Sequence, residues 1–213
     1  MASGNCDRWK RSIAGRKDIP EIKQLAPLPG GETVIGRQVR QWQRAGLDPV
    51  IVSGVSEILD WARAAQVRVI QPARCSVLAE TILSCAAEWD ADIFWTYGDV
   101  VFSDAAIDKI RQADHGPKWF GFPGDSKRWA EIFAVWMPHY FQETMIGILK
   151  KQIADPIDDT HPIYSRFSRA FGVGKFNWRN WVTINDFTFD VDFIDIYLGI
   201  VNALEAVKDA GIF

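Results

Sequence analysis

An aspartate at the end of an apolar strand is the first residue of this sequence that could do chemistry. Asp99 follows Gly98 directly after the apolar run 92–97. Its carboxylate offers hard oxygen ligands, which Mg²⁺ takes together with phosphate oxygens. Glycine and aspartate are also favoured in a plain strand-ending turn. We interpret Asp99 as a candidate metal ligand, with the simple turn as the alternative.

A second acidic group lies near the carboxyl-terminal end of the chain. Its four aspartates repel one another unless a cation or water relieves the repulsion. Asp192 suits the N-cap of the last predicted helix, and Asp195 suits its N3 position, where the positive helix end favours an acidic side chain. Asp190 caps nothing, so we predict that it is the second metal ligand, ahead of Asp186.

Flexible backbone and cations combine in the loop-like segment 1–31. Gly4 lies close to Arg8, and further basic residues follow at Lys10, Arg11, Arg16, Lys17 and Lys23. Backbone amides and basic side chains are the groups that a triphosphate needs. A solvated polar start explains the same composition. A phosphate-binding loop is therefore one of two interpretations of this segment.

Glu131 is the remaining polar candidate. It stands in the apolar segment 129–134. On a strand it points either to solvent or into a pocket, because side chains alternate between the two faces. The three histidines lie far apart, and the sequence has no HExxH, GxSxG, GxGxxG or Walker A pattern. Nothing in the sequence therefore indicates a protein nucleophile.

Alternating strands and helices must position these candidates. Val34, Ile35, Val39 and Trp42 recur at helical spacing, and Gly46 ends that helix. Apolar runs predict strands over 49–53, 67–70, 92–97, 118–122, 130–136 and 181–184, and helices over 55–65, 75–89, 103–113, 139–153, 164–171 and 193–210. This alternation is typical of a parallel sheet covered on both faces. Ligands of such sheets bind at the carboxyl ends of the strands, where Asp99 is expected.

Composition bounds the class of the protein. The 213 residues carry a net charge of −3, which gives no basic nucleic-acid footprint, and they suit one globular domain. Three cysteines without a CxxC pair argue against a disulfide scaffold and a structural zinc site. No apolar run approaches the ~18 residues of a membrane span, and the polar start is unlike a signal peptide. We therefore expect a cytoplasmic protein that does not bind membranes.

The order of these motifs resembles the sugar-nucleotidyltransferase-like family of NTP transferases. That family has a loop of the form A-A-G-x-G-x-R, then Pro-Lys-x-Leu, then a glycine before its first long helix. Segment 2–8 (ASGNCDR) is similar to the loop, with Cys6 in place of the second glycine, segment 22–25 (IKQL) is similar to the second element, and Gly30 and Gly31 precede the helix. Gly98 and Asp99 look like the metal aspartate motif, segment 190–195 (DVDFID) looks like the late Asp-x-Asp motif, and segment 129–134 looks like a strand that meets the acceptor.

The resemblance implies a fold and roles for individual residues. The implied fold is α/β, a mostly parallel, doubly wound sheet of the GT-A nucleotidyltransferase type, in one domain 1–213 with a nucleotide-binding half 1–115 and an acceptor half 116–213. The nucleotide-binding residues would be Ala2, Ser3, Gly4, Asn5, Arg8, Lys23, Gln71, Ser76 and Gly98. Lys23, Arg8 and Asp99 would act in catalysis, and Glu131 would contact the acceptor. Asp99 with Asp190 or Asp192 would hold Mg²⁺ or Mn²⁺.

The implied reaction joins a nucleoside triphosphate to a phosphorylated sugar or similar small acceptor and releases pyrophosphate. Such a transfer needs no protein nucleophile. A GT-A glycosyltransferase that uses a nucleotide sugar is the first alternative, and the many tryptophans suit sugar stacking. A non-catalytic nucleotide-binding module is the second, supported by Cys6 and opposed by the retained aspartates. The family's first strand would precede Ala2, where only Met1 stands, so either the start lies upstream or the sheet lacks a central strand.

Overall fold

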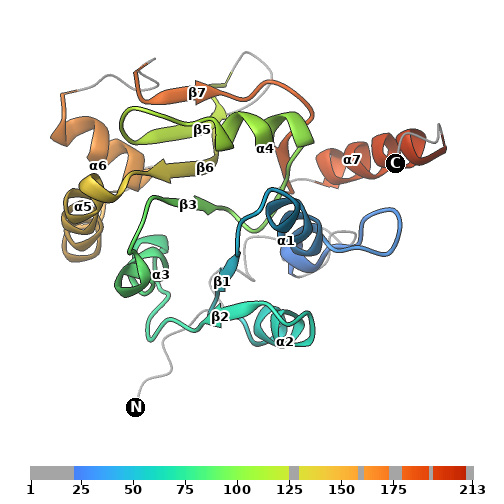
Figure 1. Cartoon of the computed structure of the whole chain (residues 1–213), viewed down its shortest axis with the longest axis horizontal. Helices are drawn as coiled ribbons and strands as arrows, with labels where there is room; N and C mark the ends of the chain where they lie inside the picture. Colours follow the sequence, from blue (N-terminus) through green and yellow to red (C-terminus); the bar gives the residue numbers. More distant parts are fainter. Residues whose placement is uncertain (1–21, 125–129, 158–160, 173–178, 192–193, 210–213) are drawn as a thin grey trace.

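The strands of the protein form three sheets in its computed structural model, which describes residues 22–124, 130–157, 161–172, 179–191 and 194–209. The main sheet has four strands in the order β3, β6, β5, β7 (Figure 1). Two smaller sheets pair β1 with β2 and β4 with β8. The strands are β1 (Val50–Val52), β2 (Arg68–Ile70), β3 (Ile93–Thr96), β4 (Val100–Val101), β5 (Lys118–Phe122), β6 (Glu131–Met137), β7 (Trp181–Thr183) and β8 (Phe189–Asp190).

Strand β6 runs against both of its neighbours in the main sheet. It is antiparallel to β3 and to β5, and β4 is antiparallel to β8, whereas β1 with β2 and β5 with β7 are parallel. The predicted α/β class is confirmed, but parallel pairs do not predominate among the described strands. The connection 123–130 between β5 and β6 is shorter than the dozen or more residues that a parallel crossover requires, so these two strands pair antiparallel.

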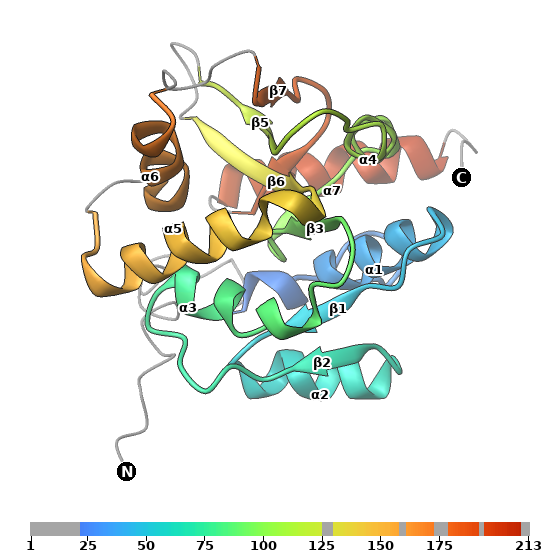
Figure 2. The ribbon, with the colours of Figure 1, turned by 60° about the vertical axis from the view of Figure 1, so that its left-hand side comes forward.

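Helices cover both faces of the main sheet, as expected for a doubly wound fold. Helices α3, α5 and α6 pack on one face with the core that contains Trp119, and α1 and α4 pack on the other with the core that contains Phe120 (Figure 2). The helices are α1 (Val34–Arg44), α2 (Ser56–Ala64), α3 (Leu78–Leu83), α4 (Asp104–Arg111), α5 (Gln142–Ala154), α6 (Pro162–Ala170) and α7 (Ile194–Asp209), with single 3₁₀ turns η3 (Lys23–Leu25), η4 (Ala86–Glu88) and η5 (His139–Phe141). None of the described helices is long and apolar enough to span a bilayer.

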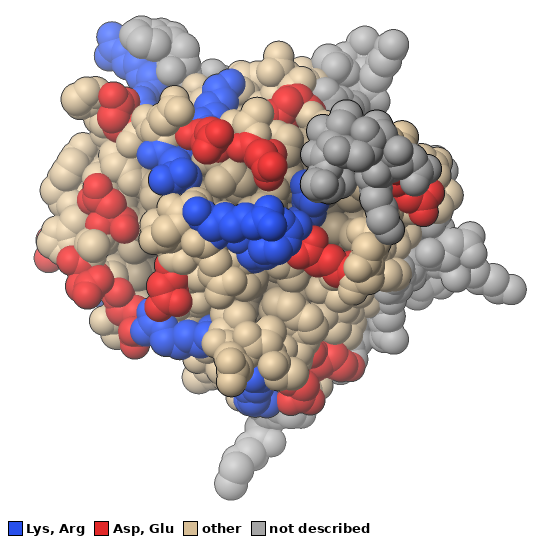
Figure 3. All heavy atoms as spheres, turned by 45° about the vertical axis from the view of Figure 1, so that its right-hand side comes forward, with Lys and Arg blue, Asp and Glu red and all other residues tan. Residues whose placement is uncertain are grey.

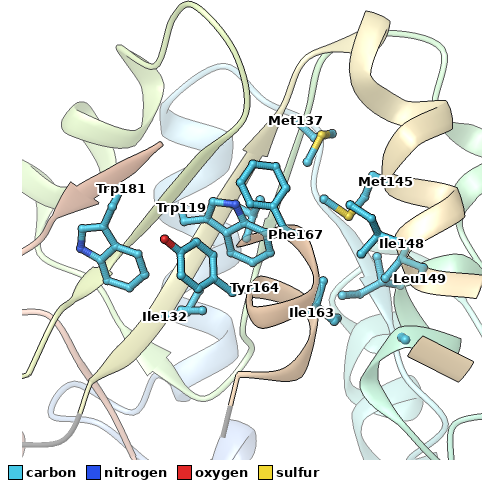
Figure 4. Packing of buried hydrophobic residues seen from close by; sticks show 13 residues of the cluster. Trp119, Ile132, Met137, Met145, Ile148, Leu149, Ile163, Tyr164, Phe167 and Trp181 are labelled. Carbon is cyan, nitrogen blue, oxygen red and sulfur yellow. The ribbon is translucent and has the colours of Figure 1, made fainter. Parts of the chain in front are cut away.

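An aromatic cluster holds α6 against the main sheet (Figure 4). The ring centroids of Trp119 and Tyr164 lie 5.0 Å apart and those of Tyr164 and Trp181 lie 5.5 Å apart, both edge to face. Trp119 is 1% exposed and Tyr164 is fully buried. Edge-to-face pairs at this separation add roughly 0.5–1.5 kcal/mol each beyond the burial of their area. These rings therefore fix α6 on the sheet, and they do not form an open stacking surface for a sugar.

The third helix is shorter than its apolar pattern predicted. It covers Leu78–Leu83 and not 75–89, and the separate turn η4 follows it. The Glu80 carboxylate accepts a hydrogen bond from the backbone N–H of Ser76 at 2.7 Å, one residue before the N-cap Val77, which has no side-chain cap. Cys75 thus lies in the loop before the helix, and it is disulfide-bonded, which the cysteine count alone did not predict.

Candidate functional site

One edge of the main sheet collects most of the described candidates. Thr96 of β3 pairs with Ala134 of β6, and the Tyr97 N–H continues this ladder by donating to the Phe133 carbonyl at 3.2 Å. Because the two strands are antiparallel, the carboxyl end of β3 lies beside Glu131, the first residue of β6. The turn with Gly98 and Asp99 and the partly buried Glu131 therefore share the edge where α/β sheets bind their ligands.

Lys23 meets Asp99 at this edge across 76 positions of sequence. The Lys23 ammonium lies 4.0 Å from Oδ2 of Asp99, and the two side chains are 15% and 22% exposed. Gly98 leaves room beside this pair, because a Cβ there would lie 3.2 Å from Cγ of Gln24, the next residue after Lys23. A basic and an acidic group, both accessible from solvent, thus face the same point.

Gln38 holds the turn that carries Asp99. Its amide nitrogen donates to the carbonyl oxygens of Tyr97 at 2.8 Å and Val100 at 2.6 Å, and its amide oxygen accepts from the Thr96 hydroxyl at 3.2 Å. Gln38 lies on α1 and is 4% exposed. The sequence analysis missed this residue. The signal was an amide within the apolar stripe of α1, because a buried polar side chain must be hydrogen-bonded.

The small sheet of β4 and β8 brings a second aspartate next to the turn. Val100 pairs with Asp190, and the Val191 N–H donates to the Asp99 carbonyl at 2.8 Å. Strand alternation places the side chains of Asp99 and Asp190 on opposite sides of this two-stranded ribbon. The backbones of Asp99 and Asp190 therefore adjoin, whereas their side chains leave the ribbon on opposite sides. Carboxylates of this kind fit a hard divalent cation.

Other candidates have different places. Asp186 accepts hydrogen bonds from the hydroxyls of Ser103 at 2.8 Å and Thr188 at 2.7 Å, which gives it a structural role at the start of α4. Gln71 and Ser76 are exposed in the loop after β2. The predicted residues Ala2, Ser3, Gly4, Asn5, Arg8 and Asp192 lie outside the described residues. Within the described ranges, no group of three or more histidine, cysteine or acidic side chains could hold a metal by itself.

The electrostatic environment of the turn is visible at Tyr97. Burial raises the pKa of the Tyr97 hydroxyl, and the nearby Asp99 carboxylate raises it further. Both effects disfavour a phenolate, because a second negative charge beside Asp99 in a poorly hydrated place is costly. Tyr97 therefore stays neutral and acts as packing behind the site.

Comparison with protein families shows to which family the chain belongs. A model of the MobA-like NTP transferase domain matches residues 15–161, which is more than half of the chain. The chain belongs to this family. The match contains Lys23, Gln38, Asp99 and Glu131, and it makes the protein a transferase related to nucleotidyltransferases. Comparison with curated proteins gave no match.

Solved structures of nucleotidyltransferases share the fold of this MobA-like domain. A 4-diphosphocytidyl-2C-methyl-D-erythritol synthase from Anaerococcus prevotii has a TM-score of 0.57 at 11% identity, covering 83% of this chain and 87% of the other. A protein assigned as a glucose-1-phosphate thymidylyltransferase from Bacillus anthracis, in complex with sucrose, has 0.61 at 12% identity, covering 88% of both chains. CTP:phosphocholine cytidylyltransferase from Streptococcus pneumoniae has 0.59 at 12% identity, covering 85% and 89%. These likenesses confirm the GT-A-like fold.

Proposed function

We propose that the protein is a metal-dependent nucleotidyltransferase that joins a nucleoside triphosphate to a phosphorylated sugar or a similar small acceptor. The observation that carries the proposal is the approach of Lys23 to Asp99, at 4.0 Å, on the ligand-binding edge of a MobA-like domain. An ammonium group can neutralise charge on phosphate oxygens, and a carboxylate can hold a divalent metal ion, so the pair suits the transfer of a nucleotidyl group. The names of the structural neighbours, two cytidylyl- or thymidylyltransferases and one diphosphocytidyl synthase, agree with this reaction.

The reaction is an in-line substitution at the α-phosphorus. An oxygen of the acceptor phosphate forms the new bond to the α-phosphorus. The bond from the α-phosphorus to the oxygen that links it to the β-phosphorus breaks. Pyrophosphate leaves with the bonding electron pair. We assign to Lys23 the neutralisation of charge on the phosphates, because its ammonium is a compact and partly exposed charge at this point. Arg8 would add a second cation, and the protein would act by positioning and charge stabilisation.

We assign a divalent cation, Mg²⁺ or Mn²⁺, to Asp99 together with Asp190 or Asp192. When bound, such a cation stabilises negative charge on the phosphate oxygens. Asp99 is the better supported ligand, because it stands at the carboxyl end of β3 and its side chain is 22% exposed. Gln38 positions this carboxylate through its hydrogen bonds to the turn.

We assign the remaining contacts by the two halves of the domain. Residues 1–115 would bind the nucleotide, with Gly98 beside the phosphates, Gln71 and Ser76 near the base and the segment from Ala2 to Arg8 as the phosphate loop. Residues 116–213 would bind the acceptor, with Glu131 as a contact. The partly buried position of Glu131 at the edge beside β3 supports this assignment.

Release of pyrophosphate tests the proposal. The wild type is incubated with each nucleoside triphosphate, with glucose 1-phosphate or phosphocholine, and with Mg²⁺, Mn²⁺ or a chelator. We expect metal-dependent release with one triphosphate, and a fall of at least about 100-fold in Asp99→Asn and Lys23→Met. Asp60→Asn is the matched control, because the Asp60 side chain on α2 is 73% exposed and its ion pair in the described part of the chain is with its helix neighbour Arg63.

The same preparations distinguish the alternatives. If only a nucleotide sugar raises the melting temperature, and Asp99→Asn abolishes this effect, the protein is a glycosyltransferase and not a nucleotidyltransferase. No release and no stabilisation with any triphosphate or nucleotide sugar would contradict both transferase reactions. Equal activity in Asp99→Asn and Asp60→Asn would contradict the assignment of Asp99.

A further inference from the structure

A buried arginine of α1 that makes no ion pair among the described residues lines a cavity together with Leu204 of α7. Arg37 is 9% exposed, and its Nε–H has no hydrogen-bond partner among the described residues. No ion pair joins Arg37 to an acidic side chain in the described part of the chain. A buried ionised group is costly unless it is paired and hydrogen-bonded. Arg37 could therefore form an ion pair with a negatively charged ligand.

The guanidinium borders a cavity that could supply this partner. The cavity has a volume of about 340 Å³ and is lined by Leu28, Pro29, Gly30, Glu32, Arg37, Arg40 and Leu204. It lies between α1, the loop before α1 and the helix α7. Neither Lys23 nor Asp99 lines it. Figure 3 shows the side of the molecule that carries α1 and α7, where basic side chains gather near the centre beside acidic ones.

The charges in the cavity select the charge of its ligand. Arg40 is already bound to Glu32 by two parallel hydrogen bonds, Nε to Oε1 at 2.7 Å and Nη2 to Oε2 at 2.8 Å. Arg37 is therefore the guanidinium of the cavity wall without an ion pair, although the Asp104 and Glu32 carboxylates also act on it through space. An oxyanion in the cavity could accept the hydrogen bond that its Nε–H lacks. A carboxylate matches the fork of the arginine donors.

The remaining walls select the body of the ligand. Leu28, Pro29 and Leu204 supply apolar surface, and Leu28 and Leu204 belong to one core cluster with α7. A cavity of about 340 Å³ has the volume of roughly ten liquid waters, which is more than a bare carboxylate fills. We propose that this cavity is a second ligand site that binds a small carboxylic acid, with the carboxylate on Arg37 and an apolar chain against Leu28, Pro29 and Leu204.

The pKa of the Arg37 guanidinium is consistent with a carboxylate ligand in the cavity. Burial lowers the pKa of this guanidinium, and the positive charge of Arg40 lowers it further, while the Asp104 and Glu32 carboxylates partly offset this. A carboxylate bound to Arg37 would favour the charged guanidinium as well. The site is separate from the proposed catalytic edge, because Gln38, the next residue of α1, points to the turn at Tyr97 and Val100.

Calorimetric titration and thermal denaturation with sodium hexanoate test the proposal. We expect hexanoate to bind and to raise the melting temperature of the wild type, with acetate and hexanol at least tenfold weaker. Arg37→Met should bind hexanoate at least tenfold more weakly and, without ligand, melt no lower than the wild type, because a buried charge that makes no ion pair is gone. Arg44→Met is the control, since Arg44 lies on the same helix but is exposed and does not line the cavity.

A second variant covers the case in which Arg37→Met does not fold. Leu204→Trp narrows the cavity and leaves every charge in place, so it should weaken hexanoate binding while the response of Arg44→Met matches the wild type. Equal hexanoate affinity in the wild type and in whichever cavity variant folds would overturn the proposal. Tighter binding of inorganic phosphate than of hexanoate, or no binding of hexanoate at tens of millimolar, would overturn it as well.

Discussion

The side chain of Gln38 allows a direct test of how the Asp99 turn is held. Replacing it by leucine, which has a similar size, removes two donated hydrogen bonds of 2.8 and 2.6 Å and one accepted bond of 3.2 Å. A buried carbonyl left without its donor costs about 1–3 kcal/mol. The Tyr97 carbonyl keeps a second, longer contact of 3.4 Å with the Val100 N–H, which lessens its loss. We expect Gln38→Leu to lower the free energy of unfolding by about 2–4 kcal/mol.

Urea denaturation and pyrophosphate release measure the two consequences. For a chain of this length, about 2–4 kcal/mol corresponds to a fall in melting temperature of roughly 4–16 °C. At a temperature where the variant is fully folded, its kcat should fall about tenfold or more while KM for the triphosphate changes little, because the role proposed for Asp99 is to stabilise the transition state. Gln43→Leu is the matched control, since Gln43 lies on the same helix and is exposed.

The comparison of the two glutamine variants can refute this reasoning. If Gln38→Leu unfolds at the same urea concentration as Gln43→Leu, the hydrogen bonds do not stabilise the turn. If it is destabilised but keeps the kcat of the wild type when folded, then Gln38 is a packing residue and does not position Asp99.

Three further predictions concern the frame of the site. Gly121→Ala should destabilise the protein by about 3 kcal/mol or more in urea denaturation, because a Cβ at this position would lie 2.0 Å from the Glu131 carbonyl oxygen, whereas Gly147→Ala on exposed helix surface should stabilise it slightly. Ser103→Ala should cost about 1–2 kcal/mol in the same assay, because its hydroxyl caps α4 by accepting from a backbone N–H, and a smaller loss would contradict the capping role. Cys85 should be alkylated slowly at neutral pH and faster only as the pH rises above the range of an ordinary thiol, because burial raises its pKa; rapid alkylation at pH 7, read by peptide mapping, would contradict this.

Local patterns in the sequence determined the elements of the fold. The apolar spacing around Val34 and Trp42 gives α1 as Val34–Arg44, and Thr33 caps it by accepting from the Gly36 N–H. The helix predicted over 103–113 is α4, and Ser103 is its N-cap. Gly98 and Asp99 were placed at the end of a strand, and they follow β3. These features were predictable because each depends on residues within a few positions of one another. The same local patterns, in their order, indicated the family.

Tertiary structure alone decided which distant groups meet. Nothing near Gln38 in the sequence reveals that its amide reaches a turn 59 to 62 positions away, since only the docking of α1 on the sheet brings them together. Because β6 runs antiparallel to β3, Glu131 at its start lies beside the carboxyl end of β3. The pairing of β8 with β4 places Asp190 next to the backbone of Asp99. The cavity at Arg37 likewise exists only because α7 closes over α1 and the loop before it. Sequence periodicity reports the buried face of each element, whereas the partners on that face depend on how the whole chain packs.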